Sequence, residues 1–252
     1  TTEIYTLSLH DALPIWKTPF GSLSRQMRYE EISYSWAITK YPVGKSEDLK
    51  ALIYILENSS PLLTNIEEYN KQRKLFAEFG GLPLKAKTRC PLSAFLVDWA
   101  GVQNGIYLMM DSPNLVGQIL QLLDMHETDV VNDLCKLAPP LIHFCDNLTS
   151  DVYAGFFEEY MAENYKKQIQ QLHSAGTKCV VHLDGTTRAL LPKLADVGFD
   201  SIEALTPRPF GDLTVEEMNE VVNNDDVIPW GGIPGPLFCP PHTWDDMKKQ
   251  VE

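Results

Sequence analysis

The chain has 252 residues, of which 44% are hydrophobic and 22% charged, so it can bury one large domain or two small ones and differs from disordered and fibrous proteins. Its formal net charge of -13 argues against nucleic acid and membrane surfaces as partners, because both are anionic. Five widely spaced cysteines without a Cys-x-x-Cys pair indicate a reducing compartment, and we expect a cytoplasmic protein.

Residues 1–15 read TTEIYTLSLHDALPI and resemble one reading frame of a sequencing adapter. As with tags and fusion scars, we exclude them from the predicted fold as an artefact, and His10 and Asp11 are assigned to no site. Residues 16–252 are predicted to form one partial domain. A helix predicted after Thr243 runs out at the last residue, so we expect the natural protein to extend beyond both ends.

Helices are predicted where capping residues precede apolar residues at helical spacing. The candidate N-caps, in chain order, are Ser46, Thr64, Ser112, Thr186 or Thr187, Thr214 and Thr243. Two of them have the spacing of a capping box, Thr64 with Glu67 and Thr214 with Glu217. A further long helix is predicted over residues 156–174, before Gly176.

Short apolar segments rich in β-branched residues separate these helices and are predicted to be strands. The clear ones are residues 141–144, 178–183, 200–205 and 227–230, and weaker ones lie near Leu84 and Trp36. The alternation of strands and helices predicts an α/β fold with a parallel sheet. About six strands are fewer than the eight of a TIM-type (β/α)8 barrel, so we expect an incomplete barrel, with truncation explaining the deficit.

Functional residues of parallel βα folds lie at the carboxyl ends of the strands. His182, in CVVHLDG, is the strongest candidate for acid–base catalysis or metal binding, the alternative being a core histidine. Asp184 follows as a second ligand or base, or as a turn residue before Gly185. Glu203 faces the same opening if its register is right, whereas a slip of one residue would direct it toward the helices.

Together, His182, Asp184 and Glu203 resemble a site for zinc or another divalent metal that lacks at least one donor. Other strand-end residues are candidates for substrate binding: Asp146, Asn147, Arg208, Trp230, Gly231 and Gly232. The first two could instead form an Asx-type turn, and Arg208 could be a solvated loop charge. His143 is interpreted as a satisfied interior group, and Cys239 as structural or, alternatively, a thiolate ligand.

Four motifs resemble the uroporphyrinogen decarboxylase superfamily. They are DNLTSDVYAGFFEEY, HSAGTKCVVHLDG, VGFDSIEALTPRPFGDLTVEE and VIPWGGIP, which begin at residues 146, 173, 197 and 227. The resemblance extends from about Ser46 to the end and implies a TIM-type barrel. The superfamily contains the decarboxylases of porphyrin biosynthesis, and methyltransferases that move methyl groups to or from corrinoid proteins or thiol acceptors.

In the methyltransferase branch a His-x-Cys pair and a distant Cys hold zinc, and related methionine synthases add a Glu. His182 matches the His and Glu203 is a candidate for the Glu, but Asp184 stands where the family has its first Cys. That replacement weakens thiol activation by zinc, because a carboxylate is a harder donor than a thiolate. The arginine-rich segment of the decarboxylase branch has only a faint counterpart in SLSRQMRY, residues 22–29.

The leading prediction is therefore a metal-assisted methyltransferase that acts on a small molecule with a corrinoid protein or a thiol acceptor. One alternative is a uroporphyrinogen (tetrapyrrole) decarboxylase, which needs no metal because a carboxylate and arginines stabilise the protonated pyrrole. Another is a non-catalytic barrel subunit that binds a corrinoid protein.

Overall fold

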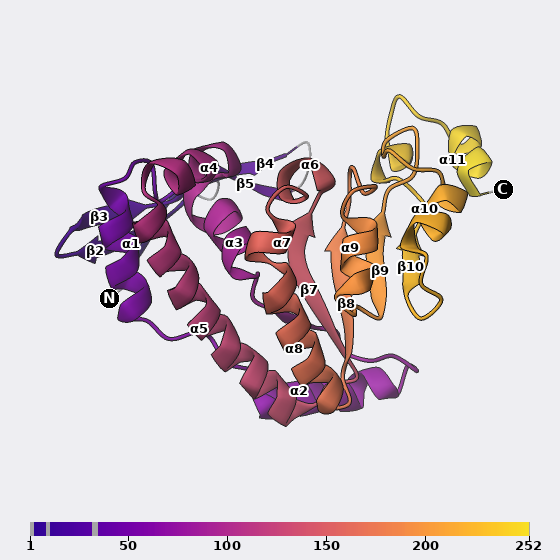
Figure 1. Ribbon diagram of the computed structural model, residues 1–252, viewed down its shortest axis with the longest axis horizontal. Coiled ribbons are helices and arrows are strands. Elements are labelled where there is room, and N and C mark those ends of the chain that lie inside the picture. The colour runs from indigo at the N-terminus through magenta and orange to yellow at the C-terminus, as the bar shows by residue number, and fades with distance from the viewer. Residues whose placement is uncertain (1–2, 9–10, 32–34, 252) are drawn as a thin grey trace. The chain divides into compact units, whose positions relative to one another are not determined.

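The structure is a computed structural model that describes residues 3–8, 11–31 and 35–251 (Figure 1). The chain divides into two compact units. Unit 1 comprises Thr1–Leu62 and Pro91–Glu127, and unit 2 comprises Leu63–Cys90 and Thr128–Glu252. No helix in the described ranges is both long enough and apolar enough to cross a membrane.

Unit 1 contains an antiparallel sheet in which β1, β2, β4 and β5 are successive neighbours and β3 pairs with β2. Its strands are β1 (Glu3–Ser8), β2 (Asp11–Thr18), β3 (Gly21–Ser24), β4 (Gln26–Glu30) and β5 (Ser35–Lys40). The candidate barrel strand near Trp36 is β5, so its predicted place in the parallel sheet is wrong. Residues of the presumed adapter lie in β1 and β2, and because strand pairing does not test their origin, the artefact assignment stays a prediction.

Helices with buried apolar faces complete unit 1. They are α1 (Asp48–Glu57), α3 (Pro91–Ser93), a π-helical segment (Ala94–Ala100), α4 (Val102–Asp111) and the first part of α5 (Pro113–Leu137), which ends in unit 2. Leu49 and Leu52, at helical spacing in α1, are fully buried, as is Phe95. The helices predicted after Ser46 and Ser112 are thus confirmed, with their apolar stripes facing the core.

Unit 2 contains the predicted parallel sheet, with strand order β10-β9-β8-β7-β6. The strands are β6 (Lys85–Lys87), β7 (Leu141–Leu148), β8 (Lys178–Leu183), β9 (Ser201–Leu205) and β10 (Ile228–Gly231). The α/β class, the four clear strands and the weak one near Leu84 are therefore confirmed. Within the described residues, β6 and β10 are edge strands of an open sheet.

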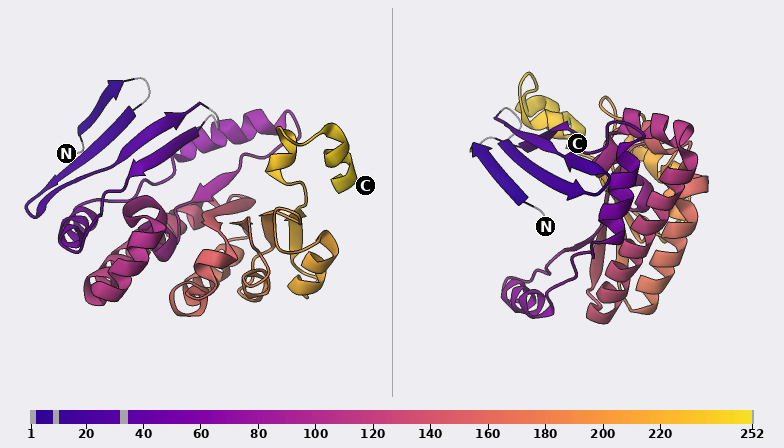
Figure 2. Two further views of the ribbon diagram at one scale, coloured as in Figure 1. Left: turned by 90° about the horizontal axis from the view of Figure 1, so that it is seen from above. Right: turned by 90° about the vertical axis from the view of Figure 1, so that its left-hand side faces the viewer.

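In unit 2, α2 precedes the first strand, and from β7 onward strands and helices alternate as expected. The helices are α2 (Ile66–Ala77), α6 (Ser150–Tyr153), α7 (Phe157–Tyr160), α8 (Ala162–Ser174), α9 (Leu191–Asp196), α10 (Val215–Val222), a 3-10 turn (Gly235–Phe238) and α11 (Trp244–Val251). Figure 2 shows α8, α9 and α10 on one face of the sheet. Phe144 and Phe199 pack edge to face beneath this layer, with ring centroids 4.9 Å apart.

Local sequence signals predict some helix ends of unit 2 correctly and others incorrectly. The capping box of Thr214 and Glu217 at α10 is confirmed, with both hydrogen bonds present. At α2 the prediction was off by one residue, because Asn65 rather than Thr64 accepts the Glu68 amide. The single helix predicted over residues 156–174 is two helices, α7 and α8, interrupted at Met161.

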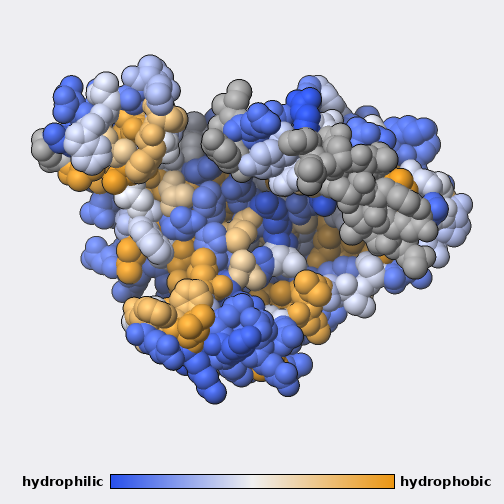
Figure 3. Space-filling view, turned by 180° about the vertical axis from the view of Figure 1, so that it is seen from behind, coloured by the Kyte–Doolittle hydropathy of each residue, from blue (hydrophilic) through white to orange (hydrophobic). Residues whose placement is uncertain are grey.

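Exposed apolar side chains gather on α2 and the residues that flank it on both sides (Figure 3). These residues are Leu63, Ile66, Leu75, Phe76, Phe79, Leu82 and Leu84. Tyr69 is the buried residue of α2. The helix is thus held mainly by its cap and this one aromatic side chain, since little of its other apolar surface leaves water.

Candidate functional site

Strand β7 presents two chemically different faces. Alternate side chains of a strand point to opposite sides, and in β7 Ile142 and Phe144 are fully buried, on the helix side. His143 and Cys145 alternate with them along the strand and are only partly buried. The HFC sequence therefore places an imidazole and a thiol on the face of the sheet that the helices do not cover.

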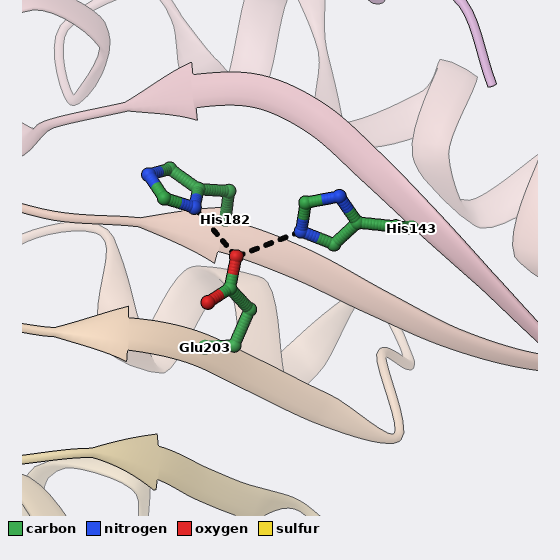
Figure 4. A group of neighbouring side chains, drawn as sticks. All are labelled: His143, His182 and Glu203. Carbon is green, nitrogen blue, oxygen red and sulfur yellow. Dashed lines mark hydrogen bonds and ion pairs between the residues drawn. The ribbon is translucent and has the colours of Figure 1, made fainter. Parts of the chain in front are cut away.

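Strand register brings three of these uncovered side chains to one place. His143 pairs with Val180 of β8, and Val180 pairs with Ser201 of β9. Two residues further along, His182 pairs with Glu203. Because paired residues of parallel strands project to the same face, His143, His182 and Glu203 converge on one face of three neighbouring strands, with His182 near the carboxyl end of β8 (Figure 4).

One carboxylate oxygen joins the two imidazoles. Oε1 of Glu203 lies 2.5 Å from Nδ1 of His182 and 2.7 Å from Nε2 of His143. An ionised carboxylate only accepts hydrogen bonds, so both ring nitrogens donate to it. The side chains are 17% exposed at His143 and 23% at each of the other two, so water screens these charge-assisted bonds less than at the surface.

Each imidazole also contacts a second group through its other nitrogen. Nδ1 of His143 is 2.8 Å from Sγ of Cys145, and Nε2 of His182 is 3.6 Å from Oδ2 of Asp184, whose side chain is 48% exposed. The hydrogen bond with Cys145 raises the pKa of His143 and burial lowers it, and with the bond to Glu203 the net result is a pKa of about 9. The structure thus gathers the three predicted residues His182, Asp184 and Glu203.

The same side chains suit a divalent metal ion. His143, His182 and Glu203 each offer a ligand atom, and these atoms lie within 4.8 Å of one another. With bonds of about 2.0–2.1 Å, tetrahedral ligand atoms are roughly 3.3 Å apart, so the nitrogen–oxygen distances would widen by less than about 1 Å. Two imidazoles and one carboxylate are a donor set of catalytic zinc sites. The residues present therefore fit such an ion.

A second group with metal-like spacing comprises His173, Cys179 and Asp200. The Asp200 carboxylate accepts hydrogen bonds from Nε2 of His173 at 2.7 Å, the Cys179 amide at 2.8 Å and Nζ of Lys178 at 2.6 Å. Burial raises the pKa of the Cys179 thiol to about 12. Because the carboxylate already accepts these three hydrogen bonds and the thiol is protonated, we interpret this group as structural. It connects the end of α8 to the starts of β8 and β9.

The structure places Asp146 on the opposite, helix-facing side of β7. Its carboxylate is fully buried and accepts hydrogen bonds from the Cys90 amide at 2.6 Å and the Tyr165 hydroxyl at 2.9 Å. Asn147 is exposed and has a φ of 58°, a left-handed conformation that Asn tolerates. The buried contacts of Asp146 anchor the end of β7 and direct its carboxylate away from the face that carries His143 and Cys145.

The remaining predicted residues lie in the loop after β9 (Arg208), within β10 (Trp230 and Gly231) and directly after β10 (Gly232). Arg208 lies 3.7 Å from the Glu217 carboxylate, and Trp230 is exposed. A Cβ atom on Gly231 would come within 2.7 Å of the Leu205 backbone, so its missing side chain admits β9 rather than a ligand. Gly232 has open space around it.

His143 and Cys145 are the site residues that the sequence interpretation did not assign. His143 is satisfied, as expected, but it faces the site and its hydrogen bonds are to site residues. The signal was present in the sequence. In LIHFCD the apolar residues Ile142 and Phe144 alternate with His143 and Cys145, and this period of two predicts opposite faces.

Comparisons with known proteins give a fold but no family. No family model matches the chain, and no curated protein matches it. The chain is similar in structure to a methyltransferase from Methanosarcina mazei. The TM-score is 0.56 at 15% sequence identity, over 86% of this chain and 62% of that one. At this identity the likeness shows the fold alone, and our chain spans less than two thirds of the other protein.

Proposed function

We propose that this chain is part of a metal-dependent methyltransferase of the uroporphyrinogen decarboxylase superfamily. The observation that carries the proposal is the convergence of His143, His182 and Glu203 on one face of three neighbouring parallel strands. The fold likeness to a methyltransferase and the sequence motifs support it. A complete TIM-type barrel, a cytoplasmic location and a corrinoid protein or thiol as methyl-transfer partner are parts of the same proposal.

In this proposal His143, His182 and Glu203 hold a divalent ion, with zinc as the leading candidate. Such an ion supplies a Lewis acid that lowers the pKa of a bound thiol or water. Zinc suits the set because it accepts both nitrogen and oxygen donors at similar bond lengths. Of the three predicted residues, Asp184 lies too far from His182 to share its hydrogen bonds. In this proposal His143 is therefore the third donor in place of Asp184.

The chain's own side chains orient and restrict the site. Glu203 fixes both rings through one oxygen, which limits their rotation before any ligand binds. Their partial burial keeps most water away from the donor atoms. Asp184 extends from beside His182 toward solvent, so it is the group placed to meet a small-molecule substrate or its cationic part.

The decarboxylase alternative finds less support in the arrangement of arginines. Arg208 and Arg188 both lie in strand-end loops, and each pairs with Glu217. Their charge is therefore partly neutralised within the chain, whereas binding a substrate with several carboxylates calls for available cations. Uroporphyrinogen turnover in metal-free protein would reverse this preference.

Metal analysis of the purified protein after incubation with zinc tests the proposal. We expect about one tightly held ion in the wild type, and strong losses in His143→Ala and in His182→Ala, because each removes one of three ligands. His173→Ala is the matched control, since it removes an imidazole from the other group and should retain the ion. Equal and negligible zinc in all four proteins would contradict the proposal.

A further inference from the structure

Cys145 lies beside the candidate metal site on the same strand as His143. Its Sγ is 2.8 Å from Nδ1 of His143, while Nε2 of that ring is 2.7 Å from Glu203. The two nitrogens flank Cε1 of the imidazole, and their hydrogen-bond directions diverge. A thiol and a carboxylate therefore contact the ring at its two nitrogens, in the order Cys145, His143, Glu203.

We propose that Cys145 is a positioning residue that keeps a proton on Nδ1 of His143, so that the proton on Nε2, which the ring donates to Glu203 in the metal-free protein, is the one that an ion replaces. The inference rests on the proposed function, because it concerns a ligand of the proposed ion. A ring nitrogen that binds a metal carries no proton, so coordination through Nε2 requires the Nδ1–H tautomer. Partners at the second nitrogen select that tautomer and fix the ring plane.

The backbone around Cys145 is anchored firmly enough for this role. Its carbonyl oxygen accepts a hydrogen bond from the Arg89 guanidinium. The next residue, Asp146, is locked on the helix side by the Cys90 amide and the Tyr165 hydroxyl. The Cys145 side chain therefore starts from a fixed point on the site face, and rotation about its Cα–Cβ bond is its main freedom.

The second histidine of the site has a looser arrangement. Asp184 is 3.6 Å from Nε2 of His182, beyond ordinary hydrogen-bond distance, and its side chain is half exposed. The Cys145 thiol is closer to His143 than the Asp184 carboxylate is to His182. The two rings therefore differ in their outer partners, and the thiol is the one whose removal should change ring orientation.

Metal titration of Cys145→Ala and Cys145→Ser, each against a competing chelator, tests the proposal with Zn²⁺ and Co²⁺. Loss of such an outer partner costs about 10- to 100-fold in metal affinity, and we expect that loss in the alanine variant. The serine variant should recover most of it, because its hydroxyl can also accept from Nδ1–H. Cys135→Ala is the control, since Cys135 is partly buried like Cys145 but its Sγ donates to the Gln171 carbonyl of α8 and not to an imidazole.

Two further readouts separate the possible failures. In ¹⁵N spectra of the wild type, the Nδ1–H proton of His143 should be visible with and without metal, and it should be lost to exchange in Cys145→Ala. Unchanged affinity in the alanine variant, or a missing Nδ1–H signal in the wild type, would overturn the positioning role. A sulfur-to-cobalt charge-transfer band that disappears in Cys145→Ser would also overturn it, by making Cys145 a ligand. If the wild type binds neither ion, the proposed function fails, while the metal-free spectra still test the Cys145 contact.

Discussion

Unit 2 contains two clusters of similar composition on the same sheet. The first cluster, His143, Cys145, His182 and Glu203, lies on one face of β7, β8 and β9. The second, His173, Cys179 and Asp200, lies where β8 and β9 begin. Both combine imidazole, thiol and carboxylate, so residue type alone would assign them the same chemistry.

The partners of the carboxylate distinguish the two clusters. Asp200 accepts from a backbone amide and a lysine as well as an imidazole, which satisfies it within the fold. Oε1 of Glu203 accepts from two imidazoles, which are themselves metal ligands when deprotonated. A carboxylate that accepts from the backbone and from lysine stabilises the fold. Where two histidines donate to one carboxylate, an ion can replace the protons that the rings donate.

The largest expected contrast comes from amide substitutions at the two carboxylates. Glu203→Gln should lower zinc affinity by more than about 100-fold, because losing a ligand costs more than losing an outer partner. Asp200→Asn should leave zinc affinity unchanged. Calorimetric titration of both variants measures the contrast, and similar losses of affinity in both would erase the distinction between the clusters.

The second contrast is in pH-dependent stability. Burial raises the pKa of Asp200, but hydrogen bonds from Lys178, the Cys179 amide and His173 lower it by more. The net pKa of Asp200 therefore lies below the ordinary value of 3.8. A carboxyl group with a lowered pKa stabilises the fold above its unfolded-state value and loses that contribution as the pH falls through its folded-state value.

Asp200→Asn should therefore cost about 2 kcal/mol of unfolding free energy at neutral pH, since hydrogen bonds to charged groups contribute on this order. The difference from the wild type should shrink below about pH 4. Denaturant unfolding at neutral and acidic pH measures it. A difference that grows on acidification would have the wrong sign for this assignment.

The smallest expected effect provides a structural reference away from both clusters. Thr214 caps α10 through the Glu217 amide, so Thr214→Ala should cost about 1 kcal/mol of stability. Zinc affinity and the pH response of Asp200 should stay as in the wild type. Thermal unfolding and one zinc titration suffice, and a change in metal binding here would show that affinity merely follows general stability.

Much of unit 2 could be predicted from sequence because its strands are short, β-branched and flanked by clear helix caps. The antiparallel sheet of unit 1 could not, since the pattern around Trp36 indicates a strand but not its partner. The break between α7 and α8 falls at Met161, where neither proline nor glycine gives a signal. Such interruptions depend on tertiary packing rather than on local propensity.

The candidate site can be predicted from sequence where the alternation of side chains between the two faces of a strand is taken into account. His182 and Glu203 were located from strand ends, and their shared register places them together. Asp146 also follows the apolar part of a strand, but its even position in β7 directs it toward the helices. The same alternation would have assigned His143 to the site. The close approach of the Leu205 backbone to Gly231 is a tertiary contact, so the sequence around Gly231 does not predict it.

X-ray absorption spectroscopy of the zinc-loaded protein tests the central claim most directly, because it reports which atoms bind the ion. We expect nitrogen and oxygen neighbours at about 2.0–2.1 Å, from the imidazoles of His143 and His182 and the carboxylate of Glu203, without a sulfur shell. A sulfur neighbour at about 2.3 Å would contradict the account, since it would place the ion with Cys179 or make Cys145 a ligand.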